Sequence, residues 1–122
     1  MTQTWGIENT NIVLTVELAD TAWKRFKGLM MRKEMPSGQA LFLHKTNSIH
    51  MCFMYFPIDA VYVDKRKRIV KIVRNLPAWT GISACLKADS VLEMKAGEAK
   101  RLGLAVGMQW KVESSMLRLG KA

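Results

Sequence analysis

The central third of the chain, residues 40–73, most constrains the fold because it contains short apolar segments and no helical periodicity. Residues 40–43, 50–55, 59–64 and 69–73 are rich in apolar or β-branched side chains, as expected for strands. Neighbouring parallel strands need a long crossover connection, usually a helix, which these segments lack. The region therefore argues against a parallel βαβ architecture and favours a mostly β domain.

Two helices are expected outside this region. Asp20 is a suitable N-cap for a helix that extends to about residue 30 and has apolar side chains at helical spacing. Gly28 lies inside that helix and weakens it by roughly 1 kcal/mol relative to alanine. A close approach of another backbone would explain the glycine. A short second helix is expected at residues 96–102, where Gly103 ends it because glycine tolerates the left-handed conformation.

Further strands are expected at residues 11–17, 90–94 and 108–112, and the strands at residues 59–64 and 69–73 are expected to form a hairpin. The fold class is therefore mainly β (α+β). We expect a small barrel or strongly curved sheet with one N-terminal helix and one short helix in the C-terminal half.

The length of 122 residues fits one domain, spanning residues 1–122. Its core is expected at about residues 11–113, with residues 1–10 and 114–122 loosely ordered. Hydrophobic residues make up 49% of the chain and charged residues 24%, which argues against wholesale disorder.

The formal net charge of +9 makes the chain basic, but its cations are scattered along the sequence. Nucleic-acid binding is therefore not expected, and solubility is the simpler interpretation. The chain has no apolar run long enough to span a membrane and no signal-peptide pattern. With two cysteines outside any CxxC motif, it is expected to be cytoplasmic, with reduced thiols and no structural zinc or other cofactor.

The strongest chemical hypothesis concerns His50, Cys52 and Met54, which would point to one side if residues 50–55 form a strand. Imidazole, thiolate and thioether groups together suit Cu(I), and zinc less well. The alternative is that Cys52 and Met54 fill the core while His50 forms a hydrogen bond at its edge. We therefore treat the three residues as weak metal-ligand candidates.

Asp59 is the second candidate because it lies within an apolar strand, where an unpaired carboxylate is costly. It would act as a general base, accept backbone N–H groups, or pair with Arg25, which we consider the most plausible partner. Cys85 lies in an irregular segment, where it could form a nucleophile with a histidine or remain an ordinary thiol. Trp79 would either line a binding rim or cover the core.

Four segments carry a family resemblance, namely residues 25–32, 40–42, 50–64 and 91–97. Together they resemble the DUF192 family, a prokaryotic domain of unknown function, over about residues 13–110. The resemblance implies a compact, mainly β domain with two helices and supplies no catalytic residues. Many members have Trp-Met-Lys-Asn-Thr where this chain has His50-Met51-Cys52-Phe53-Met54, so the His/Cys/Met trio is not general to the family.

We therefore expect a small non-enzymatic binding or accessory domain, whose groove is lined by residues 50–59 and the helix at residues 25–30. Its candidate ligand-binding residues are Arg25, His50, Met54, Asp59 and Trp79. The alternative is a small hydrolase-like or metal-dependent enzyme that uses Asp59, His50 or Cys85. The partner would be a small ligand or a protein.

Overall fold

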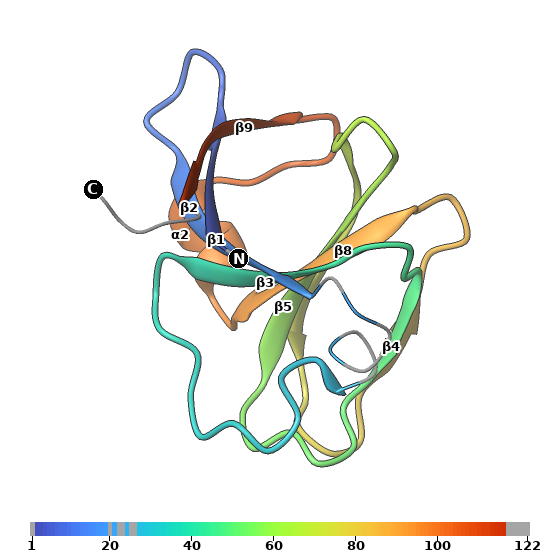
Figure 1. The fold of residues 1–122 in the computed structure, drawn as a ribbon. Coiled ribbons are helices and arrows are strands. Elements are labelled where there is room, and N and C mark those ends of the chain that lie inside the picture. The colour runs from blue at the N-terminus through green and yellow to red at the C-terminus, as the bar shows by residue number, and fades with distance from the viewer. Residues whose placement is uncertain (1, 20, 22–23, 25–26, 117–122) are drawn as a thin grey trace.

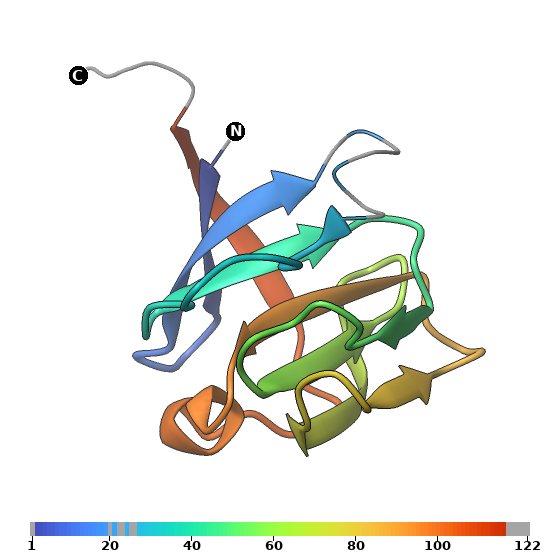
Figure 2. The same cartoon turned by 90° about the horizontal axis from the view of Figure 1, so that it is seen from below.

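The structure, a computed structural model, describes residues 2–19, 21, 24 and 27–116. Within these residues, a seven-stranded sheet curls into a half-barrel (Figures 1 and 2). Its strands are β1 (Thr2–Ile7), β2 (Val13–Ala19), β3 (Gln39–Leu43), β5 (Ile58–Val63), β6 (Ile69–Leu76), β8 (Ser90–Lys95) and β9 (Trp110–Met116). A smaller sheet pairs β4 (Ser48–His50) with β7 (Ile82–Ala84), and the short helix α2 (Glu98–Leu102) follows β8. The predicted mainly β fold with a strongly curved sheet is thus confirmed.

The strand order in the large sheet is β6-β5-β8-β3-β2-β1-β9. Every neighbouring pair is antiparallel except β2 and β3, which are parallel. The predicted N-terminal helix falls in the connection between these two strands, and residues 20, 22–23 and 25–26 of it lie outside the described residues. At its end, the backbone N–H of Gly28 donates to the carbonyl of Lys24 at 2.9 Å, a helical pattern.

The two outer strands of the large sheet meet at one end. The N–H of Trp110, at the start of β9, donates to the carbonyl of Lys67 at 2.9 Å, and Ile69 of β6 donates to the carbonyl of Met108 at 2.7 Å. Arg68 and Gln109 form an isolated bridge between the same segments. These contacts partly close the curled sheet, as barrels do to remove their open edges.

Both faces of the central strands are buried. In β5, Ala60 and Tyr62 point to one hydrophobic cluster and Val61 and Val63 to another. The small β4–β7 sheet contributes to the first cluster, whereas Trp5 lies in the second. Double burial explains why β5 is apolar on both faces, apart from Asp59, rather than alternating.

The hairpin of β5 and β6 and the strands corresponding to β2, β3, β8 and β9 agree with the sequence-based predictions. The short C-terminal-half helix is also confirmed, and Gly103 follows it with the expected left-handed φ of 71°. No helix in the described part of the chain is long and apolar enough to cross a membrane.

The expected loose N-terminus is contradicted. Residues Thr2–Ile7 form β1, which pairs with β2 on one side and β9 on the other. Its Trp5 is 0% exposed and contacts the ring of Phe42 with centroids 4.9 Å apart. Trp5 and Ile7 thus pack the segment into the core, in addition to its backbone pairing, a role that the polar local composition did not reveal.

The predicted extended segment at residues 50–55 is wrong beyond His50. Strand β4 ends there, and the N–H of Met54 donates to the carbonyl of Met51 at 3.1 Å to form a turn. Phe53 in this turn has a positive φ of 63°. His50, Cys52 and Met54 therefore do not share the face of one strand.

Candidate functional site

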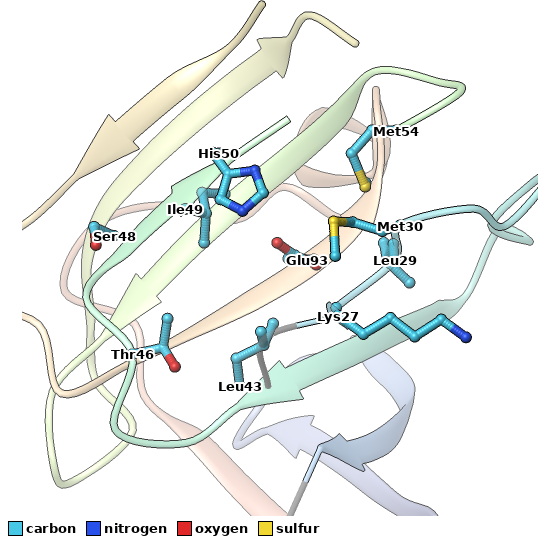
Figure 3. A pocket seen from close by; sticks show the side chains of 11 residues that line it. Lys27, Leu29, Met30, Leu43, Thr46, Ser48, Ile49, His50, Met54 and Glu93 are labelled. Carbon is cyan, nitrogen blue, oxygen red and sulfur yellow. The ribbon is translucent and has the colours of Figure 1, made fainter. Parts of the chain in front are cut away.

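A pocket of about 270 Å³ opens beside the inner face of β8 (Figure 3). Residues from four parts of the chain line it: the turn after the predicted helix, the end of β3, the β4 segment, and β8. The lining residues are Lys27, Gly28, Leu29, Met30, Leu43, Thr46, Ser48, Ile49, His50, Met54 and Glu93. The pocket brings together two of the predicted site residues, His50 and Met54.

Glu93 is the central polar group of this pocket (Figure 3). It lies on the same face of β8 as Val91, which packs in the first hydrophobic cluster, so its side chain is only 4% exposed. Its Oε1 has no hydrogen-bond partner among the described residues. Burial raises the pKa of Glu93 to about 7, although the charge of Arg32 and a hydrogen bond from the backbone of Leu29 oppose the shift.

Gly28 lies close to this buried carboxylate oxygen. A Cβ at position 28 would lie 3.2 Å from the Oε1 of Glu93 and 3.7 Å from a methyl carbon of Leu43. Its φ of +52° also lies in the left-handed region, which glycine adopts without strain. The close approach predicted at Gly28 thus involves side chains, rather than another backbone.

The walls of the pocket are mostly aliphatic and thioether side chains, although Thr46, Ser48 and His50 also line it. Met30 and Met54 lie on one side of Glu93, and Ile49 and His50 lie on the other (Figure 3). Met54 is buried at 2% exposure, whereas Met30 is partly buried against the first cluster. The surroundings of the carboxylate are therefore largely apolar and polarisable.

The predicted metal trio is divided between the pocket and the surface. His50 and Met54 line the pocket, whereas Cys52 is exposed and does not line it. The Nδ1 of His50 accepts the backbone N–H of Cys52 at 3.3 Å, so in the neutral ring the Nε2 carries the proton and is a donor. Among the described residues, no group of three or more His, Cys, Asp or Glu could hold a metal ion.

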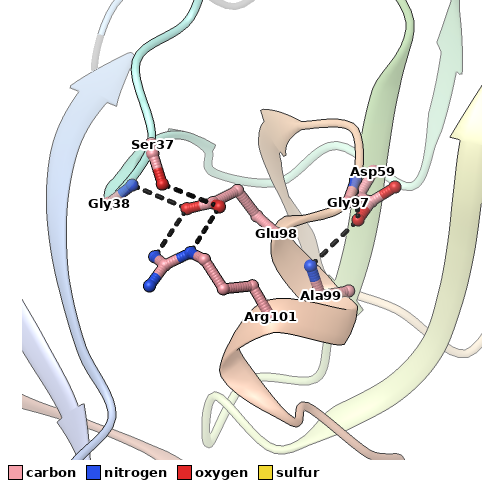
Figure 4. Close-up of polar contacts among 7 residues, drawn as sticks. All are labelled: Ser37, Gly38, Asp59, Gly97, Glu98, Ala99 and Arg101. Carbon is pink, nitrogen blue, oxygen red and sulfur yellow. Dashed lines mark hydrogen bonds and ion pairs between the residues drawn. The ribbon is translucent and has the colours of Figure 1, made fainter.

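Asp59 lies on the opposite face of β5 from the pocket, beside the start of α2 (Figure 4). It is 1% exposed and accepts backbone N–H groups from Asn75 at 2.9 Å, Gly97 at 3.0 Å and Ala99 at 2.9 Å. The carboxylate therefore joins β5 to the end of β6 and to the start of α2. Its predicted partner, Arg25, lies outside the described residues.

A second buried acid, Glu98, holds α2 against the turn before β3 (Figure 4). Its carboxylate accepts hydrogen bonds from the Nε of Arg101 at 2.7 Å, the N–H of Gly38 at 2.6 Å and the hydroxyl of Ser37 at 2.9 Å. These contacts, led by Arg101, lower the pKa of Glu98 to about 2. Such a fully occupied carboxylate is structural.

Trp79 and Cys85 lie outside the pocket lining. Trp79 is 49% exposed, and its ring contacts those of Phe53 and Tyr55 at centroid distances of 5.4 and 6.0 Å. Cys85 is half-buried against the first cluster. The structure therefore does not bring either residue together with His50 or Glu93 in this pocket.

The sequence analysis did not select Glu93, the residue most central to the pocket. The available signal was the same as for Asp59, because Glu93 is an acid between Leu92 and Met94 within an apolar strand. The two acids differ in what the fold gives them: Asp59 receives three backbone donors, whereas the Oε1 of Glu93 receives none among the described residues.

The DUF192 family model, described as an uncharacterized ACR, matches residues 5–112. The chain belongs to the DUF192 family. This DUF192 chain is 31% identical to a UPF0127 protein of Thermococcus sibiricus and 33% identical to one of Thermococcus gammatolerans. Each match covers 80% of this chain and 67% of the relative. The relatives therefore extend beyond the region that they share with this chain.

Two solved structures share the DUF192 fold. A protein of unknown function from Novosphingobium aromaticivorans has a TM-score of 0.79 at 24% identity, covering 91% of this chain and 84% of its own. A proposed transcription regulator from Sinorhizobium meliloti has a TM-score of 0.81 at 25% identity, covering 91% and 92%. These likenesses support the half-barrel architecture and assign no specific function.

Proposed function

We propose that this DUF192 domain is a non-enzymatic binding domain whose small-molecule site is the pocket over Glu93. The observation that carries the proposal is the Oε1 of Glu93, a buried acceptor without a partner among the described residues. Such an acceptor costs free energy unless a ligand or water supplies a donor. A pocket next to that atom, with apolar walls, gives a small molecule both a hydrogen bond and a hydrophobic surface.

The enzyme alternative has less support from the geometry. Asp59 is occupied by three backbone N–H groups, and Cys85 does not line the pocket. Glu93 and His50 line the same pocket, but no hydrogen bond among the described residues joins either of them to a hydroxyl or thiol nucleophile. The contact expected of an activated nucleophile is therefore not formed within the described part of the chain.

The proposal can be tested with a library of small fragments, using protein with ¹³C-labelled methionine methyl groups. Ligands of the pocket should shift the methyl signals of Met30 and Met54, which line it, and should raise the unfolding temperature. Met30→Trp should fill the pocket and abolish both effects. Met31→Trp is the matched control, because Met31 is exposed and does not line the pocket.

Three results would contradict the proposal. The first is a screen in which no fragment shifts either methyl signal. The second is a set of ligands that bind while leaving both signals unchanged. The third is binding that survives in Met30→Trp as well as in Met31→Trp.

We also propose that the domain acts in the reducing cytoplasm of a prokaryote. Cys52 and Cys85 are both free thiols, which suits a reducing compartment. The cations of the basic surface, including Lys65 and Arg66 at the tip of the β5–β6 hairpin, are expected to favour solubility rather than nucleic-acid binding. If this view is right, the protein should fail to bind nucleic acid even at low salt, where binding through a basic surface is strongest.

A further inference from the structure

We propose that the ligand of this pocket carries a primary ammonium group, which binds the Oε1 of Glu93, on a compact apolar body. The inference rests on the proposed function and adds the chemical class of the ligand. It starts from the buried carboxylate at the centre of the pocket, whose oxygen has no donor among the described residues. An ammonium group supplies a charge-assisted hydrogen bond, which is stronger than one from a neutral hydroxyl.

Access to the carboxylate depends on Gly28. A Cβ at position 28 would lie 3.2 Å from Oε1, so the glycine keeps a methyl group away from this oxygen. An alanine there would place its methyl group against the oxygen that the ammonium must reach. The glycine therefore serves the pocket as well as the left-handed backbone.

The side chains that line the pocket indicate the size and polarity of the rest of the ligand. Leu29, Leu43 and Ile49 supply aliphatic surface, and Met30 and Met54 supply thioethers. The volume of about 270 Å³ lies below the range of about 300–1,000 Å³ typical of sites for drug-sized molecules. A short alkyl group matches both the size and the polarity of this space.

Other ligand classes fit less well. An anion would meet the carboxylate of Glu93, and a divalent cation would find no cluster of three oxygen, nitrogen or thiolate residues among those that the structure describes. A neutral alcohol would satisfy Oε1 with a weaker bond. The ammonium is the group that both satisfies the acceptor and compensates its charge.

The charged and titratable groups around Glu93 influence this pairing. Arg32 faces it from the turn after the predicted helix but binds Glu17 at 3.1 Å, and the Nζ of Lys27 points away from the carboxylate (Figure 3). His50 lies across the pocket. Tyr62 lies on β5, where burial raises the pKa of its hydroxyl and the charge of Glu93 adds a smaller contribution. Since burial raises the pKa of Glu93 to about 7, ammonium binding should strengthen as the pH rises from about 6 to 8. A variant of Glu93 is needed to show that this pH dependence comes from its carboxylate.

The test compares n-butylammonium with n-butanol, which have similar size and differ in the donor. At about pH 8, the methyl signals of Met30 and Met54 should respond to butylammonium with an affinity about tenfold higher than to butanol. Glu93→Gln should abolish this preference, whereas the exposed Glu34→Gln should retain it with the same loss of formal charge. Gly28→Ala should also weaken butylammonium binding, because it covers Oε1 without removing the carboxylate.

The outcomes separate the ligand class from the proposed function. If butanol binds as well as butylammonium in the unchanged protein, the ammonium proposal is wrong and the pocket remains a binding site. If neither compound nor any library fragment shifts the two methyl signals, the pocket is filled by water and both proposals fail. A retained preference in a folded Glu93→Gln variant would also overturn the ammonium proposal.

Discussion

The Oδ2 of Asp59 accepts the backbone N–H of Ala99 at 2.9 Å, although the two residues are 40 positions apart. The first N–H groups of a helix have no partner within the helix, and a nearby side chain usually caps them. Here Gly97 occupies the N-cap position without a side chain, so an acid from the central strand β5 provides the cap. This contact ties the orientation of α2 to the large sheet.

Replacement of Asp59 should therefore destabilise the fold strongly. Asp59→Ala leaves the N–H groups of Asn75, Gly97 and Ala99 without their acceptor and should lower the free energy of unfolding by at least about 3 kcal/mol. Asp59→Asn retains one oxygen and should lose less. Urea denaturation measures the loss of free energy of unfolding in both variants. Asp64→Ala is the control, since Asp64 caps exposed N–H groups of a turn. Equal losses at the two positions would contradict a structural role for Asp59.

The stability of the domain should depend on the ionisation of Glu93. Its folded pKa of about 7 lies above the ordinary value of 4.5, so the folded state holds the proton more tightly. The resulting stability is complete below about pH 4.5 and is lost as the pH rises through 7. Relative to Glu93→Gln, the unchanged protein should lose up to about 3 kcal/mol across this interval. Denaturation series at several pH values would measure this loss. A difference in free energy of unfolding between the two proteins that stays constant with pH would refute the prediction.

Glu98 should show the opposite dependence. Its folded pKa of about 2 lies below 4.5, so it contributes stability above pH 4.5 that disappears as the pH falls towards 2. Glu98→Gln should cost about 2 kcal/mol near pH 7 and much less in acid, because the charge-assisted bonds are then absent in both proteins. Ser37→Ala removes only one donor and should have a smaller effect. A cost that does not change with pH would argue against the charged network.

Gly28 should resist replacement for two reasons. Its left-handed backbone strains any other side chain, and its surroundings place Glu93 and Leu43 within 3.2 and 3.7 Å of a new Cβ. Gly28→Leu should therefore cost more than about 2 kcal/mol. Gly38→Leu is the matched control, because Gly38 has a φ of +81° and no atom within 4 Å of a Cβ. If thermal unfolding shows the same loss for both variants, close packing at Gly28 is not the cause.

The two thiols should be reduced in the cell and differ in their reactivity. Cys52 is exposed and Cys85 is half-buried, so an alkylating reagent should label Cys52 first in the native protein. Both should react once the protein is denatured in a rapidly quenched extract. Mass spectrometry can follow the order of labelling. A disulfide between them in that extract would overturn the proposed compartment.

The sequence by itself determined the strand-rich architecture and several boundaries. Apolar runs without intervening helices predicted β3, β5 and β6, and Gly103 marked the end of α2. These features follow from local causes: side-chain periodicity, turn chemistry, and the backbone freedom of glycine. The family was also recognisable, because its motifs occur in order along most of the chain.

The tertiary structure decided which polar residues face a pocket. Asp59 and Glu93 are both acids in apolar strands. The packing of α2 supplies donors to Asp59, whereas no residue that the structure describes supplies one to the Oε1 of Glu93. The pocket joins Gly28, Met54 and Glu93, which lie far apart in the sequence. Local patterns determine whether a side chain can point to a given face of a strand. What covers that face depends on contacts between distant segments, so the site appeared only in the folded chain.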